Sequence, residues 1–190
     1  VVVGNPPWLK LQFEEKDIIA ELFPEVSIRK TTAPQVRKLQ ESYLAVPAQK
    51  AAYFAENIGI ESSALFMNAV QNYPLLKGQQ TNLYKCVLEN GFSLTAPQGF
   101  MGLLHPEGVY DDPNGQPLRK EMYKRLQYHF QFTNEFTLFS EVHHNTVFGI
   151  QIYAGNKSDV SFYSISNLFH PSTIDPSFIH QQNRVAGGLK

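Results

Sequence analysis

The first eight residues, VVVGNPPW, constrain the fold more than any other stretch of the chain. Residues 1–3 are valines, and such a β-branched run favours a strand that is parallel and covered on both faces. Pro6 and Pro7 must end this strand, because proline has no backbone N–H to donate to a neighbour. Asn5 is therefore presented at the carboxyl end of a strand, where open α/β sheets place their ligands. We expect the strand to be central, beside a strand over residues 100–104.

Asn5, Pro6, Pro7 and Trp8 resemble the Asn-Pro-Pro-aromatic motif of amino-group methyltransferases, especially N6-adenine-specific DNA methyltransferases. The resemblance implies that the Asn5 side-chain oxygen and the Pro6 carbonyl each accept one N–H of an exocyclic amine. The amine lone pair would then point at the methyl sulfonium of S-adenosylmethionine. It also implies that Pro7 stiffens the loop and that Trp8 stacks on an adenine flipped out of double-stranded DNA. The alternative is an ordinary Pro-Pro turn with Trp8 in the core.

The order of elements in the second half of the chain extends this resemblance, which covers residues 1–8 and about 81–154. Hydrophobic periodicity predicts a helix, a strand, a helix and two further strands, over residues 81–88, 100–104, 117–126, 130–139 and 146–153. The last two strands are expected to form a hairpin. A terminal antiparallel hairpin is what the methyltransferase sheet has and the ordinary dinucleotide-binding sheet lacks. The fold class is therefore α/β, the catalytic half of a partial Rossmann-like S-adenosylmethionine methyltransferase sheet.

The chain divides into three predicted parts. Residues 1–8 and 78–158 form the catalytic half of the methyltransferase domain. Residues 9–77 form a helical insertion, in which Pro47 opens one helix and Ser62 or Ser63 starts the next. Residues 159–190 are expected to be a loop or linker toward another domain, with a short strand over 160–165. Because residue 1 already lies in a predicted core strand, we expect the chain to be part of a longer polypeptide.

Two further residues are candidates for the site. In the family, a helix carrying Leu-Tyr follows the catalytic loop, and Leu83-Tyr84 resembles it, which places Tyr84 near the cofactor or the catalytic loop. The alternative is a core tyrosine. His105 leaves the carboxyl end of the 100–104 strand and is a candidate substrate-binding residue, or else a loop histidine. His143 and His144 point apart on an extended chain and lack further spaced ligands, so we predict no metal site.

Charge and glycine content limit what the chain does alone. No acidic or aromatic residue precedes a glycine-rich strand-to-helix turn of the kind that holds S-adenosylmethionine, so we expect the main cofactor site elsewhere in the polypeptide and no activity from the isolated chain. The net charge is −1, whereas self-sufficient DNA-binding domains are usually basic. Arg29, Lys30, Arg37 and Lys38 are the one basic concentration of the insertion, and either contact phosphates or form a solvated helix face.

These observations predict a site-specific DNA adenine N6-methyltransferase that uses S-adenosylmethionine, as part of a restriction–modification or phage-defence enzyme with its restriction or defence subunits. Methylation of a protein glutamine or an RNA guanine is the alternative chemistry, although those enzymes more often have Tyr at the aromatic position and no long insertion. A non-catalytic DNA-recognition or scaffold module is the alternative of another class. The single Cys86 and the lack of a signal peptide or membrane span predict a cytoplasmic protein.

Overall fold

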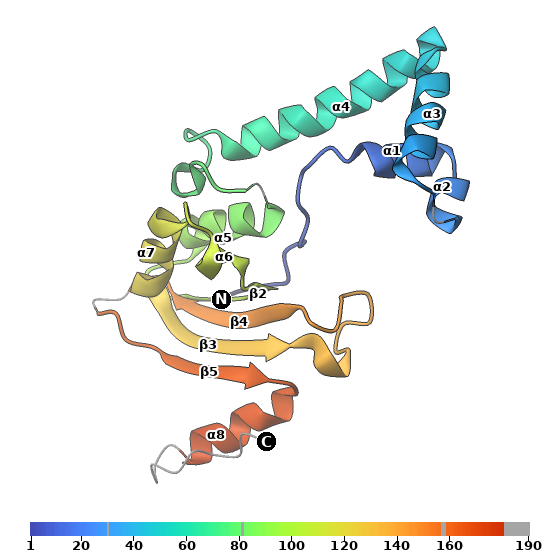
Figure 1. Ribbon diagram of the computed structural model, residues 1–190. Coiled ribbons are helices and arrows are strands. Elements are labelled where there is room, and N and C mark those ends of the chain that lie inside the picture. Colours follow the sequence, from blue (N-terminus) through green and yellow to red (C-terminus); the bar gives the residue numbers. More distant parts are fainter. Residues whose placement is uncertain (30, 81, 157–158, 181–190) are drawn as a thin grey trace.

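A five-stranded mixed sheet lies at the centre of the computed structural model, which describes residues 1–29, 31–80, 82–156 and 159–180 of the 190 (Figure 1). The strands are β1 (Val2–Gly4), β2 (Phe100–Pro106), β3 (Leu126–Thr133), β4 (Val147–Ala154) and β5 (Tyr163–Leu168). Their order is β1-β2-β4-β3-β5; β4 lies antiparallel between β2 and β3, and the other pairs are parallel. The predicted α/β class and its antiparallel hairpin are confirmed, because the sheet is mixed and the consecutive strands β3 and β4 pair antiparallel.

The helices fall into three groups. They are α1 (Glu15–Leu22), α2 (Glu25–Ile28), α3 (Ala33–Leu44), α4 (Pro47–Asn68), α5 (Leu83–Leu94), α6 (Gly108–Asp111), α7 (Gln116–Arg125) and α8 (Ile174–His180). Helices α5, α6 and α7 cover one face of the sheet, and α8 lies beyond β5 (Figure 1). Helices α1–α4 pack on one another and extend away from the sheet, and we call them the arm. The predicted helices over 81–88 and 117–126 are confirmed as α5 and α7, although residue 81 lies outside the described residues.

The core occupies both faces of the sheet because side chains alternate along β2 and β4. Met101, Leu103 and Tyr153 point toward α5 and pack with the buried Leu88. On the opposite face, Phe130 and Phe132 of β3, Phe148 of β4 and Leu168 of β5 form a second cluster, with Trp8 against it. The sheet is therefore fixed from two sides, and it holds the ends of its strands in place.

The prediction that the first strand is central and covered on both faces is wrong. β1 pairs in parallel with β2, as expected, but it is the edge strand among the described residues. Val2 packs against the α5 side, whereas Val1 and Val3 are 96% and 81% exposed. A β-branched run reports a preference for extended backbone and carries no information on how many layers cover it.

Other boundaries also differ from expectation. β3 ends at Thr133, not at residue 139, because a 3-10 turn follows and Thr137 adopts a left-handed conformation at φ 49°. The two helices expected after Pro47 are the single helix α4, since Gly59 is tolerated within it and no break occurs before Ser62. The short strand expected over residues 160–165 is present as β5, displaced toward residue 168, whereas α8 lies where a loop or linker is expected. Residues 181–190 lie outside the described residues. The division into domains stays a prediction.

Candidate functional site

The Asn-Pro-Pro-Trp loop begins where β1 ends, at Gly4. Because β1 and β2 are parallel, their carboxyl ends lie at the same edge of the sheet. Pro6 is buried and fixes the loop, whereas Asn5 and Pro7 are exposed. Within the part of the chain that the structure describes, the Asn5 carboxamide forms no hydrogen bond to another residue. It is therefore available as an acceptor and donor at the sheet edge.

A hollow of about 410 Å³ opens beside this carboxamide. One wall is the whole motif, from Asn5 to Trp8, and the other is the loop between β3 and β4, with residues 138–142. This volume lies within the range of small-molecule sites. The sequence analysis missed the second wall because it assigned residues up to 139 to a strand. The signal present in the sequence was Asn134 before Leu138-Phe139, a turn-forming residue close to apolar residues in a linker.

Asn134 holds the second wall in place. Its side chain is fully buried, and its Nδ2 donates to the carbonyl oxygens of Phe139 (2.9 Å) and Val142 (2.8 Å). Its Oδ1 accepts from the Phe139 backbone N–H at 3.0 Å. One carboxamide thus satisfies three backbone groups that no strand partner reaches. The loop that faces Asn5 is consequently defined by a buried polar residue and the turn at Thr137.

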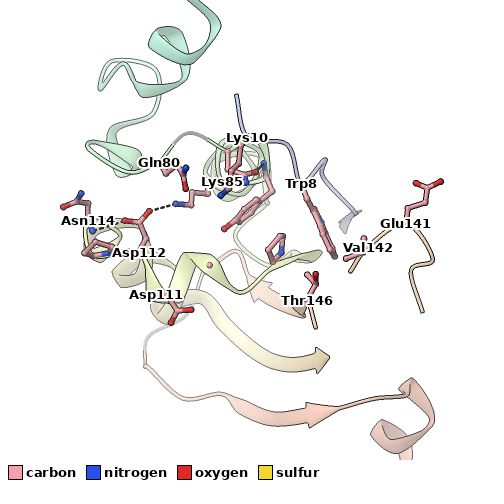
Figure 2. Close-up of a pocket in the computed structure, with 15 residues that line it drawn as sticks. Trp8, Lys10, Gln80, Lys85, Asp111, Asp112, Asn114, Glu141, Val142 and Thr146 are labelled. Atoms are coloured by element: carbon pink, nitrogen blue, oxygen red, sulfur yellow. Dashed lines mark hydrogen bonds and ion pairs between the residues drawn. The ribbon is translucent and has the colours of Figure 1, made fainter. Parts of the chain in front are cut away.

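Trp8 is half-buried and separates two hollows. Its ring centroid lies 5.8 Å from that of Phe148 and 5.8 Å from that of Phe139, and its Nε1 lies 3.5 Å from the Leu104 carbonyl oxygen. It lines the hollow beside Asn5 and also a larger one of about 780 Å³. Figure 2 shows Trp8 between the side that carries Lys10 and Lys85 and the side that carries Val142. The ring is fixed by the core, and part of its surface remains open to both hollows.

The larger hollow has a polar wall built on an ion pair. Lys85 Nζ lies 2.6 Å from Asp112 Oδ2 and 3.1 Å from Gln79 Oε1, and both charged side chains are almost buried (Figure 2). Burial alone would raise the pKa of Asp112, but the hydrogen bonds from Lys85 and the Asn114 backbone hold it below its usual range. The ammonium of Lys85 is therefore already neutralised, and the open cation of this hollow is the exposed Lys10.

Tyr84 and His105 lie behind this wall and are stacked on each other at 5.2 Å. Burial raises the pKa of Tyr84 well above its usual value, with Asp112 and Glu107 adding to the effect. His105 is fully buried, and burial lowers its pKa to about 4, so the ring is neutral. His105 Nδ1 lies 2.9 Å from the Pro106 carbonyl and must donate to it, which leaves Nε2 as the acceptor for the Tyr153 hydroxyl at 3.5 Å.

These positions bear on both candidate roles. His105 has no accessible surface in the described chain, and its ring supports the pocket wall from inside the core. A substrate-binding role for His105 stays a prediction, and these positions supply no surface for direct contact. Tyr84 lines the larger hollow but is 2% exposed. A place near the cofactor remains a proposal for Tyr84.

The described residues contain no glycine-rich strand-to-helix turn beside the motif, and the expectation that the main S-adenosylmethionine site lies elsewhere in the polypeptide stays a prediction. They also contain no group of three or more His, Cys, Asp or Glu side chains that could hold a metal ion. None of the helices in the same residues has the length and apolar composition needed to cross a membrane.

No protein-family model and no curated protein sequence matches this chain. Among solved structures, a Listeria monocytogenes protein assigned to the class I S-adenosylmethionine-dependent methyltransferases is 16% identical, with a TM-score of 0.41 over 60% of this chain. DrdV in complex with DNA is 14% identical, with a TM-score of 0.42 over 87% of this chain. A nuclease-deletion mutant of the Type ISP restriction–modification enzyme LlaGI, with a DNA substrate mimic, is 13% identical, with a TM-score of 0.43 over 86%.

This chain spans 36% of the Listeria protein and 14% of each of the two larger enzymes.

Proposed function

We propose that this chain forms the target-base side of a site-specific DNA adenine N6-methyltransferase, within a cytoplasmic restriction–modification or defence enzyme. The observation that carries the proposal is the position of Asn5. Its carboxamide is exposed, has no hydrogen-bond partner among the described residues, and lines a hollow of about 410 Å³ at the carboxyl edge of the sheet. A free acceptor at this edge, followed by two rigid prolines, is what a planar amine substrate requires.

The chemistry assigned to the chain is to hold and orient the amine. The Asn5 Oδ1 and the Pro6 carbonyl oxygen each accept one N–H, which weakens conjugation of the nitrogen with the purine and directs its lone pair outward. Pro7 restricts the loop, and the open part of the Trp8 ring stacks on the flipped base. S-adenosylmethionine supplies the methyl group when bound. Since we expect its main site elsewhere in the polypeptide, we assign this chain the acceptor side of the reaction.

The loop over residues 138–142 closes the hollow from the other side. Phe139 packs edge-on against Trp8 and Phe148, so the aromatic wall is rigid before a base enters. A preorganised wall lowers the entropic cost of capturing a flipped nucleotide. This arrangement supports a base-sized ligand over an extended glutamine-containing peptide.

Product analysis separates the candidate functions. The full-length protein is incubated with S-adenosylmethionine and duplex DNA of mixed sequence, and the digested nucleosides are examined by mass spectrometry. We expect N6-methyladenine and no other methylated nucleoside. Methylated guanine in RNA, or methylated glutamine in a protein extract, would support the alternative chemistry. DNA binding without any methylated product would support the recognition or scaffold module.

A further inference from the structure

A second surface, remote in sequence from Asn5, gathers positive charge at the end of the arm. Residues 26–40 hold four of the 16 Lys and Arg residues and no Asp or Glu, although the chain has 17 acidic residues. One of the four, Lys30, lies outside the described residues. Arg29, Arg37 and Lys38 are exposed and form no ion pair with any residue that the structure describes. This segment therefore carries a local excess of positive charge, and Glu25 and Glu41 border it in the sequence.

This surface is hollowed rather than flat. A cavity of about 420 Å³ lies between the α2–α3 connection and α3, lined by Arg29, Thr31, Gln35, Lys38, Leu39 and Ser42. None of these residues is acidic. The carboxamide oxygen of Gln35 is used, since it accepts from the Thr32 backbone N–H at 2.9 Å, so the amide hydrogens are what Gln35 can offer to a ligand. The hollow thus presents a guanidinium, an ammonium and an amide, all of them donors.

We propose that this hollow binds a phosphate of the DNA backbone, and that the arm is a sequence-independent contact with the duplex. Phosphodiester oxygens only accept hydrogen bonds, and guanidinium and ammonium groups are their usual partners in proteins. That the phosphate belongs to duplex DNA rests on the proposed function. An acidic protein segment would meet the same donors but would leave the arm unrelated to the hollow beside Asn5.

The placement of the arm supports this choice. In Figure 1 the α1–α3 end of the arm and the loop between β3 and β4 lie toward the same side of the molecule. That loop forms one wall of the hollow beside Asn5. A duplex that delivers a base to this hollow can therefore extend toward the arm. A contact with the backbone there would add affinity without reading sequence.

The test compares two double variants of the full-length protein. Arg29→Gln with Lys38→Gln removes both cations of the hollow. Lys50→Gln with Lys77→Gln removes the same charge from exposed positions outside it, one of them on α4 of the same arm. Binding to fluorescently labelled duplex DNA is measured by anisotropy over a range of salt concentrations, without S-adenosylmethionine. Circular dichroism verifies that each variant is folded.

We expect the first variant to bind on the order of 10-fold more weakly at moderate salt and equally so for all sequences. The slope of log affinity against log salt should fall by up to about 2, since each neutralised phosphate contributes about 0.9. The Lys50/Lys77 variant should keep the wild-type slope. A third variant, Arg29→Gln with Lys38→Arg, keeps one of the two positive charges and should recover about half of the lost DNA affinity.

Three results overturn the inference. The Arg29/Lys38 variant could bind DNA with the wild-type affinity and salt slope, or both double variants could lose the same affinity. The Arg29/Lys38 variant could also lose affinity for polyglutamate while its DNA binding is unchanged. The last would assign the hollow to an acidic protein partner. Because Asn5 is unchanged and methylation is not measured, failure here leaves the proposed function standing. If the arm binds DNA but the protein methylates no base, the proposed function fails and the inference about the arm stands.

Discussion

The sheet buries side chains on both of its faces, whereas the arm of α1–α4 has a small core of Ile19, Val26 and Tyr53. In the arm, α3 has no buried residue, and α4 has Tyr53 alone. The difference matches what each region is proposed to do. Orienting an amine requires positions fixed to a fraction of an ångström, which a core on two faces provides. A phosphate contact by long cationic side chains tolerates movement of the helix that carries them.

Two matched core truncations should expose this difference most strongly. Leu88 and Ile19 are both fully buried. Leu88 lies on α5 and packs against the sheet, and Ile19 lies in the core of the arm. Leu88→Ala should destabilise the whole sheet by about 2–5 kcal/mol, the usual range for a buried leucine. Ile19→Ala should release hydrogen-exchange protection in residues 15–68 and leave β2 and β4 protected. The distinction between the two regions is wrong if Ile19→Ala lowers the hydrogen-exchange protection of β2 and β4 as much as that of residues 15–68.

Asn134→Ala tests whether a single buried carboxamide fixes the second wall. The change removes the Asn134 partner of the Phe139 N–H and of the Val142 carbonyl, at a cost on the order of 3 kcal/mol, while the Phe139 carbonyl keeps the Val142 N–H. We expect a lower melting temperature and a larger loss of methyl transfer than stability alone explains. Asn145→Ala, an exposed position in the same loop, is the control and should change stability by less than about 0.5 kcal/mol. Equal effects of the two substitutions would contradict this role.

His105 should make the sheet sensitive to acid. Its pKa is about 4 in the folded protein and about 6.5 when unfolded, so the unfolded chain takes up a proton first as the pH falls. Stability is complete above about pH 6.5 and is lost as the pH falls toward 4, by about 2 kcal/mol between pH 7 and 5. Urea titrations at several pH values measure this slope. In His105→Phe the loss of stability between pH 7 and 5 should be smaller by about 2 kcal/mol. An unchanged loss would show that His105 is not the group responsible.

Tyr53→Phe should give the smallest effect. It removes a hydroxyl that accepts a hydrogen bond from Gln40 Nε2 at 3.1 Å while keeping the ring in the arm core. The expected cost is about 0.5–1.5 kcal/mol, seen as faster hydrogen exchange within the arm only. Tyr43→Phe is the matched control, because the Tyr43 hydroxyl forms no hydrogen bond within the described part of the chain. A response in the sheet would mean that the two regions unfold as one unit.

The sequence predicted the parts of the fold that depend on local pattern. The period-2 alternation of residues 148–153 and the helical spacing of Leu118 and Met122 are local properties, and β4 and α7 follow them, although Leu126 already begins β3. The exposure of Val3 was not predictable, because it depends on which strands and helices pack nearby. The burial of His105 also depends on distant residues, Tyr84 and Tyr153, which the topology brings to it.

The same distinction applies to the site. Asn5 and the two prolines are adjacent in sequence, and their chemistry could be read from residue type and order. The opposite wall is formed more than 130 residues later, by a loop whose shape depends on the buried side chain of Asn134. No periodicity marks such a loop, since one carboxamide replaces the hydrogen bonds that a strand would provide.

The most direct test of the central claim is single-turnover methyl transfer by Asn5→Ala in the full-length protein. Duplex DNA containing adenine is the substrate, and binding is measured in parallel at fixed salt. We expect the rate to fall by about 10²–10³, because a preorganised acceptor for the amine is lost, while DNA affinity stays near the wild-type value. A variant that methylates at the wild-type rate would show that Asn5 is only a turn residue and would contradict the proposed methyltransferase site.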